Sequence, residues 1–587
     1  MGVNIIVSIK LDIKRGQPIY KYEFCQVVTS EKKNYVYTTI FTGNNALSDF
    51  SRCSTLFFAF EKNFYPKLDT IILQKMIRSL ITSSIKIKST NNARHLFTQT
   101  SKSLAKSLTI QKLNPRVLEA QYAVRGELVI KSMEMQKDLE TGSSKLPFKS
   151  IIACNIGNPQ EVGQSPISFP RQVLALCTCP ELLEIPSVID SLPKDVVERA
   201  KRYLKEIPSG TGAYSQSKGV EVVRNEIAAF IEERDGHSAD PNHIFVTDGA
   251  SPAVQMSLQA MIAHDNVGIM IPIPQYPLYS AGIAMNGGKA VSYFLDEASD
   301  WSMQITELQR SLDEAISNGT EVRALAVINP GNPTGQVMPY DEMKGVVQFC
   351  YDNGLVLLAD EVYQENIWMN DRIFNSFKKV LRDMETNSEI PSGETELLSF
   401  HSVSKGFLGE CGRRGGYVEF VNINEDALDQ MYKLASVNLC SNLDGQLTVG
   451  LMVQPPKEGD ESYSKYLQEK NNIMESLQRR ADRIVTALNT LEGVTCNTTQ
   501  GALYAFPQIQ LPQGAVDRAA ELGKPADAYY CLELLDNTGI VVVPGSGFGQ
   551  VDGTWHFRTT ILPQEDDFDD VIDRMTRFHT DFMAKHQ

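Results

Sequence analysis

Seven short apolar runs in the middle of the chain limit its fold more than any other feature. They are residues 243–247, 267–271, 289–295, 324–328, 355–359, 397–401 and 416–421. Apolar residues follow one another in these runs without polar alternation, and a loop and an amphipathic stretch come after each run. Strands of this kind are buried on both faces, which is typical of a mainly parallel sheet covered by helices on each side. The runs therefore predict one large α/β domain around a seven-stranded sheet.

The segments that flank these runs predict a second, smaller α+β domain. Residues 128–140 have helical spacing of apolar side chains, and Gly142 is a plausible end for that helix. A long helix is expected from Ser441 to about residue 491, with further strand and helix signals after it. We assign residues 113–199 and 441–587 to the small domain and an N-terminal arm. Residues 200–440 form the large domain that binds the ligand.

Composition excludes several classes of protein. With 42% hydrophobic and 22% charged residues among 587, the chain is an ordinary globular protein. No apolar run approaches the roughly 18 residues that cross a bilayer, and a net charge of −15 disfavours a general nucleic-acid binder. The ten cysteines are scattered, and the close pair Cys177 and Cys179 has the wrong spacing for a zinc or redox site. We expect reduced thiols in an intracellular protein and no bound metal.

The basic residues gather at the N-terminus. Residues 1–112 hold 17 Lys or Arg and 6 Asp or Glu, a net charge of +11, and no acidic residue occurs between Asp69 and Glu119. From Met76 to residue 112 the chain is basic and rich in Ser and Thr, which predicts a mitochondrial transit segment. A solvated basic linker in a cytoplasmic protein is the alternative. Because transit peptides are N-terminal, we expect Met76 to be an initiation site and residues 1–75 to be an extension of unknown role.

Candidate site residues follow the predicted strands, at the edge where open parallel sheets bind ligands. Asp360 follows the fifth run, where it either caps the next helix or holds a cationic ring nitrogen. Asn332 lies in the Asn-Pro-Gly-Asn-Pro-Thr-Gly loop after the fourth run. Ala250 and Ser251 open a helix after the first run, whose free backbone N–H groups suit a phosphate. Tyr276, in a proline-rich turn after the second run, presents an aromatic ring or packs at the surface.

A lysine completes this set. Lys405 follows the sixth run in Ser402-Val-Ser-Lys405, an unusual place for a solvated charge, although a lone lysine is usually at the surface. The set then supplies an amine, a carboxylate, hydrogen-bond donors, an aromatic plate and a phosphate site. A pyridine-aldehyde phosphate cofactor requires these parts. Their coincidence at one edge of a sheet predicts an enzyme that uses such a cofactor.

At these residues the chain resembles the fold-type I pyridoxal-phosphate aminotransferases of class I and II. Within this family it is most similar to the enzymes that act on alanine. The matching segments cover roughly residues 113–587 in the expected order: 122–127, 272–279, 327–335, 358–364, 405–417 and 543–550. The resemblance implies pyridoxal 5'-phosphate as cofactor and a ping-pong reaction. In that reaction L-alanine and 2-oxoglutarate give pyruvate and L-glutamate, without a nucleic-acid or membrane partner.

Two other functions stay open at this point. Another aminotransferase with the same cofactor, such as one that uses glyoxylate, would keep every site residue and differ only in its side-chain pocket. A non-catalytic protein could use the same fold as a binding module. That second alternative expects loss of Lys405 or Asp360 and an attached DNA-binding domain, whereas both residues are present.

The resemblance also implies a role for each cofactor-binding residue. Lys405 binds the cofactor aldehyde covalently, and Asp360 pairs with the ring nitrogen. Asn332 and Tyr363 bond the phenolate oxygen of the ring, and Tyr276 stacks on its face. The phosphate ligands implied by the resemblance are Ala250, Ser251, Ser402 and Arg414.

The remaining implied roles concern the substrate and a second subunit. Arg558 binds the substrate carboxylate, and Gly157 lines the substrate site with Asn332. Tyr214 matches the tyrosine that reaches the phosphate of the neighbouring subunit, which implies a homodimer. In most of the family the phosphate arginine lies eight residues after the lysine, here Arg413, whereas the alanine enzymes carry one extra residue, which favours Arg414.

Overall fold

The computed structural model describes residues 4–14, 17–27, 56–57, 108–120, 126–142 and 145–587, in two compact units, residues 1–109 and 110–587. In the first unit, β1 (Asn4–Lys14) and β2 (Gln17–Val27) form an antiparallel hairpin, and β3 (Leu56–Phe57) pairs in parallel with β1. The predicted start at Met76, most of the predicted transit segment, and residues 122–125 of the first matching motif lie outside the described residues.

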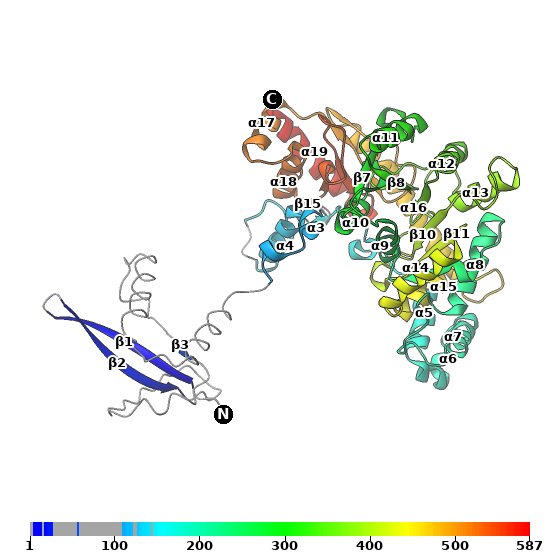
Figure 1. The fold of residues 1–587 in the computed structure, drawn as a ribbon, viewed down its shortest axis with the longest axis horizontal. Helices are drawn as coiled ribbons and strands as arrows, with labels where there is room; N and C mark the ends of the chain where they lie inside the picture. Colours follow the sequence, from blue (N-terminus) through cyan, green and yellow to red (C-terminus); the bar gives the residue numbers. More distant parts are fainter. Residues whose placement is uncertain (1–3, 15–16, 28–55, 58–107, 121–125, 143–144) are drawn as a thin grey trace. The chain divides into compact units, whose positions relative to one another are not determined.

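The second unit is built around a seven-stranded sheet of order β5-β11-β10-β9-β8-β6-β7 (Figure 1). The strands are β5 (Ile244–Thr247), β6 (Val267–Ile273), β7 (Lys289–Phe294), β8 (Glu321–Ile328), β9 (Val356–Asp360), β10 (Leu397–Ser402) and β11 (Gly416–Val421). Neighbouring strands run parallel, except that β11 is antiparallel to both β10 and β5. The prediction of an α/β fold around a mainly parallel seven-stranded sheet is confirmed.

Helices cover both faces of this sheet, which explains why its strands are apolar throughout. On β8, Leu325 and Val327 pack into one core, whereas Ala324, Ala326 and Ile328 pack into another. The first core is completed by α11 (Ile305–Ser317), α12 (Tyr340–Asn353) and α13 (Phe377–Thr386), and the second by α9 (Ala250–Met261), α10 (Leu278–Asn286) and α14 (Glu425–Val437) (Figure 1). Burying one such side chain contributes about 1.5–3 kcal/mol, so both faces stabilise the sheet.

Two further cores complete this unit. One contains α5 (Ser168–Thr178), α7 (Lys194–Glu206), α8 (Glu221–Asp235) and α15 (Leu443–Val453), with α6 (Pro186–Ile189) nearby. The other, which we call the C-terminal core, contains α16 (Tyr463–Leu488), α17 (Gln513–Glu521), α18 (Ala526–Thr538) and α19 (Glu565–His586). None of the described helices combines the length and the apolar character that a membrane span needs.

Short strands and two early helices pack with the C-terminal core or beside it. The strands are β4 (Ile152–Ala153), β12 (Val494–Thr495), β13 (Tyr504–Ala505), β14 (Gln508–Ile509), β15 (Ile540–Val541), β16 (Val543–Pro544) and β17 (Phe557–Thr560). The helices are α3 (Pro115–Glu119), which contacts α10, and α4 (Glu127–Glu140), which contacts α18. Gly142 follows α4 with φ +68°, so the predicted helix and its end are confirmed.

The single long helix expected from Ser441 to about residue 491 is wrong. The structure has two helices there, α15 and α16, separated by residues 454–462. Pro455 and Pro456 follow directly on the end of α15. Proline has no backbone N–H and disfavours a helical conformation in the residue before it, so the pair ends the helix.

Candidate active site

The turn after β10 places the amine of Lys405. The strand ends at Ser402, and the Gly406 amide in the turn donates a hydrogen bond of 2.9 Å to Oδ1 of Asn366. Lys405 is half-buried, and its Nζ donates a hydrogen bond of 2.7 Å to the carbonyl oxygen of Gly157. The same Nζ lies 5.7 Å from the centre of the Tyr363 ring. The amine is therefore held against other site residues.

Gly157 allows this approach because it has no side chain. A β-carbon at this position would lie 2.8 Å from Lys405 Nζ and would collide with the hydroxyl of Tyr504. The space in front of the lysine amine is thus bounded by bare backbone, and we expect any larger residue at position 157 to displace Lys405 or Tyr504.

Asp360 ends β9 as a buried carboxylate, 5% exposed. The Tyr279 hydroxyl donates a hydrogen bond of 3.2 Å to its Oδ2. Burial raises the pKa of Asp360 to about 6, although Tyr279, the Val362 amide and the charge of Lys405 act in the other direction. A buried carboxylate of this kind is stabilised by a cation placed beside it, so it fits a protonated ring nitrogen.

Arg558, on β17, is a buried cation that has no carboxylate partner among the described residues. Its side chain is 1% exposed, Nη1 donates a hydrogen bond of 2.9 Å to Oδ1 of Asn332, and Nη2 donates to the carbonyl of Asn155. Its Nε has no partner, and no carboxylate of the described residues forms an ion pair with it. A buried guanidinium is costly without a counter-charge, and its planar geometry matches a carboxylate. The site therefore fits a ligand with a carboxylate group.

Asn332 joins Arg558 to the residues around Lys405. Its Nδ2 donates a hydrogen bond of 3.3 Å to the hydroxyl of Tyr363, and both side chains are buried. Because Asn332 follows β8 while Tyr363 follows β9, which pairs in parallel with β8, the carboxyl ends of these strands bring the two together. This is the arrangement that the sequence predicted for the sheet edge.

The backbone and side chains where α9 begins fit an anion. The residue before the helix is Gly249, with φ +85° and no side chain to cap the first amides of α9. Nη2 of Arg414 donates a hydrogen bond of 2.7 Å to the carbonyl of Asp248, and a β-carbon on Gly249 would lie 2.5 Å from that Nη2. The free amides at Ala250 and Ser251 and the guanidinium of Arg414 together fit a phosphate.

Ser402 belongs to the same edge, whereas Arg413 does not. Ser402 pairs with Gly416 on β11, which in turn pairs with Thr247 at the end of β5. Arg413 lies instead 3.9 Å from a carboxylate oxygen of Glu410 and 3.6 Å from one of Asp444.

Local backbone geometry separates the two arginines. Arg414 directly follows the 3-10 turn Cys411–Arg413, and its φ of +55° lies in the left-handed region. Because the backbone conformation changes between Arg413 and Arg414, their side chains point in different directions. This geometry favours Arg414 over Arg413 as the residue for the phosphate.

The two remaining predicted residues, Tyr276 and Tyr214, differ in exposure. Tyr276 is half-buried and packs against the core that contains α9 and α10. Tyr214 is 80% exposed, and no contact with the site residues above is found for it among the described residues. The contact of Tyr214 with a second subunit stays a prediction.

Three residues of the site were not predicted from the sequence. Tyr504 and Asn155 come from segments outside the seven-stranded sheet, where the rule about strand ends gives no guidance. Tyr279 lies within a matching motif, yet nothing in its spacing distinguishes an Asp360 partner from a packed core tyrosine.

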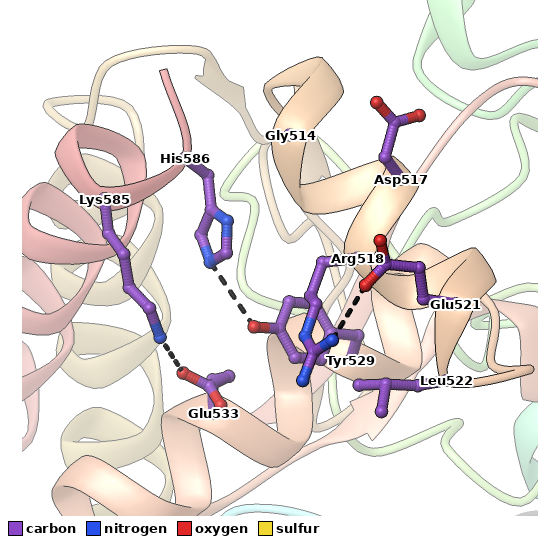
Figure 2. A pocket seen from close by; sticks show the side chains of 9 residues that line it. All are labelled: Gly514, Asp517, Arg518, Glu521, Leu522, Tyr529, Glu533, Lys585 and His586. Atoms are coloured by element: carbon purple, nitrogen blue, oxygen red, sulfur yellow. Dashed lines mark hydrogen bonds and ion pairs between the residues drawn. The ribbon is translucent and has the colours of Figure 1, made fainter.

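Another hollow of the surface lies between α17, α18 and the end of α19 (Figure 2). Four of its ionic groups are paired, Arg518 with Glu521 at 2.8 Å and Lys585 with Glu533 at 2.8 Å. None of the predicted site residues lines it. We therefore place the candidate active site at the sheet edge and not in this hollow.

Comparisons with known proteins show the family of the chain. The family described as aminotransferase class I and II matches residues 187–575. The chain is 54% identical to alanine aminotransferase 2, mitochondrial, of Arabidopsis thaliana, over 81% of this chain and 88% of that protein. It is 52% identical to alanine aminotransferase 2 of Panicum miliaceum, over 82% of this chain and 100% of that protein. The solved alanine aminotransferase of Pyrococcus furiosus shares the fold, with a TM-score of 0.62, 23% identity, and coverage of 80% and 100% of the two chains.

Proposed function

This chain belongs to the class I and II aminotransferase family, and we propose that it transfers the amino group reversibly between L-alanine and 2-oxoglutarate, giving pyruvate and L-glutamate. It is a transaminase that depends on pyridoxal phosphate, with the fold-type I architecture. The observation that carries the proposal is the buried, unpaired Arg558, hydrogen-bonded to Asn332, in the same site as Lys405. Amino and keto acids share the α-carboxylate that such an arginine binds.

We assign the cofactor contacts from the chemistry of each residue. Asp360 would hold the ring nitrogen, Asn332 and Tyr363 the phenolate oxygen, and Tyr276 the ring face. The amide of Ala250 and the side chains of Ser251, Ser402 and Arg414 would hold the phosphate. When bound, pyridoxal phosphate supplies an electron-withdrawing ring that stabilises negative charge on the substrate α-carbon.

The protein residues supply the other parts of the reaction. Arg558 and Asn332 orient the substrate carboxylate, and the bare backbone at Gly157 leaves room for the α-carbon near Lys405. We assign to Lys405 the covalent link to the cofactor and then, once an incoming amine has released it, the role of base that takes the α-proton. Asp360, as a carboxylate beside the ring nitrogen, keeps that nitrogen protonated.

We predict that replacing Arg414 weakens cofactor binding more than replacing its neighbour Arg413. Replacing Arg414 with alanine removes a charged donor beside Gly249, so we expect the dissociation constant of pyridoxal phosphate to rise at least about tenfold, in line with about 1.5–3 kcal/mol for such a bond. The matched control is Arg413→Ala, which removes only ion pairs to Glu410 and Asp444. Titration of the apoprotein with cofactor measures both, and a larger loss in the Arg413 variant would contradict the assignment.

A substrate survey tests the proposed function. Purified protein is assayed with alanine or aspartate as amino donor and with 2-oxoglutarate or glyoxylate as acceptor. We expect the highest kcat/KM for alanine with 2-oxoglutarate. Faster turnover with aspartate, or with glyoxylate as acceptor, would assign a different transaminase reaction to the same site, and no transamination at all would contradict the proposal.

Arg558 has a matched control in the same assay. In Arg558→Lys the planar fork is lost, and we expect kcat/KM for alanine to fall about 100-fold, the size of a lost charged hydrogen-bond pair. Arg480 is also buried, and its Nη1 donates to the carbonyls of Leu562 and Pro563. Arg480→Lys should leave kcat/KM within a few-fold of the parent protein. Equal losses in both variants would show that the effect is structural.

We also propose that the protein is a homodimer, in which Tyr214 of each subunit reaches the phosphate site of the other. The exposure of Tyr214, 80% within one chain, supports this assignment. Analytical ultracentrifugation of the purified protein tests it, because a sedimenting species with the mass of a single chain would contradict the proposal.

The location we propose is the mitochondrial matrix. The support is the basic, acid-free sequence from Met76 onward, and one similar protein, from Arabidopsis thaliana, is named as mitochondrial. Fusing residues 76–112 to a fluorescent protein tests this proposal. Import of the fusion into mitochondria is the expected result, and a diffuse cytoplasmic signal would contradict it.

A further inference from the structure

Tyr504 reaches the centre of the site from outside the large sheet. It lies on β13, which pairs with β17, the strand that carries Arg558, and only 2% of it is exposed. The Tyr363 hydroxyl donates a hydrogen bond of 3.0 Å to the Tyr504 oxygen. The guanidinium of Arg558 lies 4.2 Å from the centre of the Tyr504 ring. Tyr504 thus contacts residues assigned to both the cofactor and the substrate.

The hydroxyl of Tyr504 also faces the lysine amine. The point where a β-carbon of Gly157 would stand collides with this hydroxyl and lies 2.8 Å from Lys405 Nζ, so the two groups are close to each other. Hydrogen bonds run from Asn332 to Tyr363 and from Tyr363 to the Tyr504 oxygen. Tyr363 donates its hydroxyl proton to the Tyr504 oxygen, so Tyr504 exchanges its own proton with Lys405 and not with Tyr363.

The charges around Tyr504 favour its ionised form. Burial raises the pKa of Tyr504, but the positive charges of Lys405 and Arg558 and the hydrogen bonds from Tyr363 and Lys405 outweigh burial and bring the pKa below its usual value. Tyr363 behaves in the opposite way, since burial and the neighbouring Tyr504 raise its pKa. Of the two tyrosines in contact, Tyr504 is therefore the one that gives up its proton first.

We propose that Tyr504 is a further catalytic residue, which takes a proton from the ammonium group of Lys405 and returns it later in the reaction. In this step an N–H bond of Lys405 Nζ breaks and an O–H bond of Tyr504 forms. The ammonium becomes a neutral amine and the phenolate becomes a phenol, with no change of oxidation state and no other reactant. The inference rests on the proposed function, because it requires Lys405 to act as the base.

Substrate binding gives this transfer its direction. With no anion on Arg558, its positive charge and that of Lys405 favour a phenolate at Tyr504. A substrate carboxylate on Arg558 neutralises the charge of Arg558, so the proton affinity of Tyr504 rises. Once the incoming amine has released Lys405 as an ammonium group, Tyr504 takes its proton, and a neutral amine is available beside the α-carbon. The network thereby couples carboxylate recognition to activation of the base.

The test compares Tyr504→Phe with Tyr530→Phe in the holoenzyme. Tyr530 is a suitable control because it is also buried and hydrogen-bonded, to Nδ1 of His579 at 3.0 Å, and lies in the C-terminal core. We expect kcat of the Tyr504 variant to fall about 100-fold, within the range of lost proton-transfer catalysis. The KM for alanine should change little, because Arg558 is retained. The Tyr530 variant should keep the parental kcat.

A spectroscopic readout separates this role from a merely structural one. An ultraviolet pH titration of the parent holoenzyme should contain one tyrosine that ionises below about pH 10, the usual pKa of the side chain. That signal should be absent from Tyr504→Phe and present in Tyr530→Phe, because burial raises the pKa of Tyr530. The titration of the parent protein needs no variant, so it can be read even if Tyr504→Phe folds poorly.

The inference requires that Tyr504→Phe both lowers kcat and loses the tyrosine that ionises below about pH 10. A parental kcat in Tyr504→Phe, or an early-ionising tyrosine that survives in this variant, overturns it. Borohydride labelling of Lys405 in parent and variant keeps this result distinct from the proposed function. If Lys405 is labelled and the parent protein transaminates, a negative result concerns Tyr504 alone. If neither holds in the parent protein, the proposed function fails first.

Discussion

Lys405→Ala is expected to lose transamination by at least about 10⁴-fold in kcat/KM, the upper range for loss of a catalytic base. The loss follows from two roles of one amine, since Lys405 is assigned both the covalent link to the cofactor and the transfer of the α-proton. Its Nζ is held by a hydrogen bond of 2.7 Å to the Gly157 carbonyl, beside the other residues of the site. Steady-state assays with alanine and 2-oxoglutarate measure the effect.

Lys470 provides the control for a lysine near this region. It pairs with Glu365 at 3.4 Å and lies over the ring of Phe407, outside the assigned contacts of cofactor and substrate. Lys470→Ala should keep activity within a few-fold of the parent protein. Substantial activity in Lys405→Ala, with unchanged fold by circular dichroism, would remove the mechanism proposed above.

Asp360→Ala is expected to lower kcat by about 1000-fold while some cofactor remains bound, a size typical of lost electrostatic stabilisation of a transition state. The reason is that the carboxylate keeps the ring nitrogen protonated, and an unprotonated ring stabilises less negative charge on the α-carbon. Asp360 is buried with the Tyr279 hydroxyl as a donor, so water does not replace its charge. Measurement of kcat at saturating cofactor isolates this effect from weaker binding.

Glu361 provides the control for Asp360. Its variant shows whether the loss in Asp360→Ala comes from the charge at the cofactor ring or from the loss of any buried carboxylate. Glu361 is fully buried, and it accepts hydrogen bonds of 2.7 Å from the Phe377 amide and from the Ser399 hydroxyl, away from the cofactor contacts. Burial raises its pKa to about 7, so Glu361→Gln resembles a form that the native protein already populates near neutral pH. That variant should retain most of the parental kcat. A loss of less than tenfold in Asp360→Ala would count against the role of Asp360.

Burial explains why the sequence predicted the sheet and its edge. The alternation of residues such as Val327 and Ala326 between two cores leaves no polar face on the central strands, so each strand appears as a continuous apolar run. The loops after these runs then contain Asp360, Asn332 and Lys405, and the structure brings them together. The antiparallel direction of β11 could not be predicted, because an apolar run is the same in both directions.

Contacts between segments far apart in the sequence account for the parts that were missed. Tyr504 lies on a two-residue strand, and its place beside Lys405 depends on the pairing of β13 with β17. The break between α15 and α16 has a local signal in Pro455 and Pro456, which the prediction of one long helix did not use. Arg414 was favoured over Arg413 through the resemblance alone, because residue spacing does not reveal the left-handed conformation of Arg414.

The most direct test of the account is chemical labelling of the native protein. Sodium borohydride reduces a covalent bond between a lysine amine and the cofactor aldehyde, so the label survives digestion and is located by mass spectrometry. We predict a single modified peptide with the mass of the reduced pyridoxyl phosphate on Lys405. A label on another lysine, or none in protein purified with its cofactor, would contradict the assignment on which the active site rests.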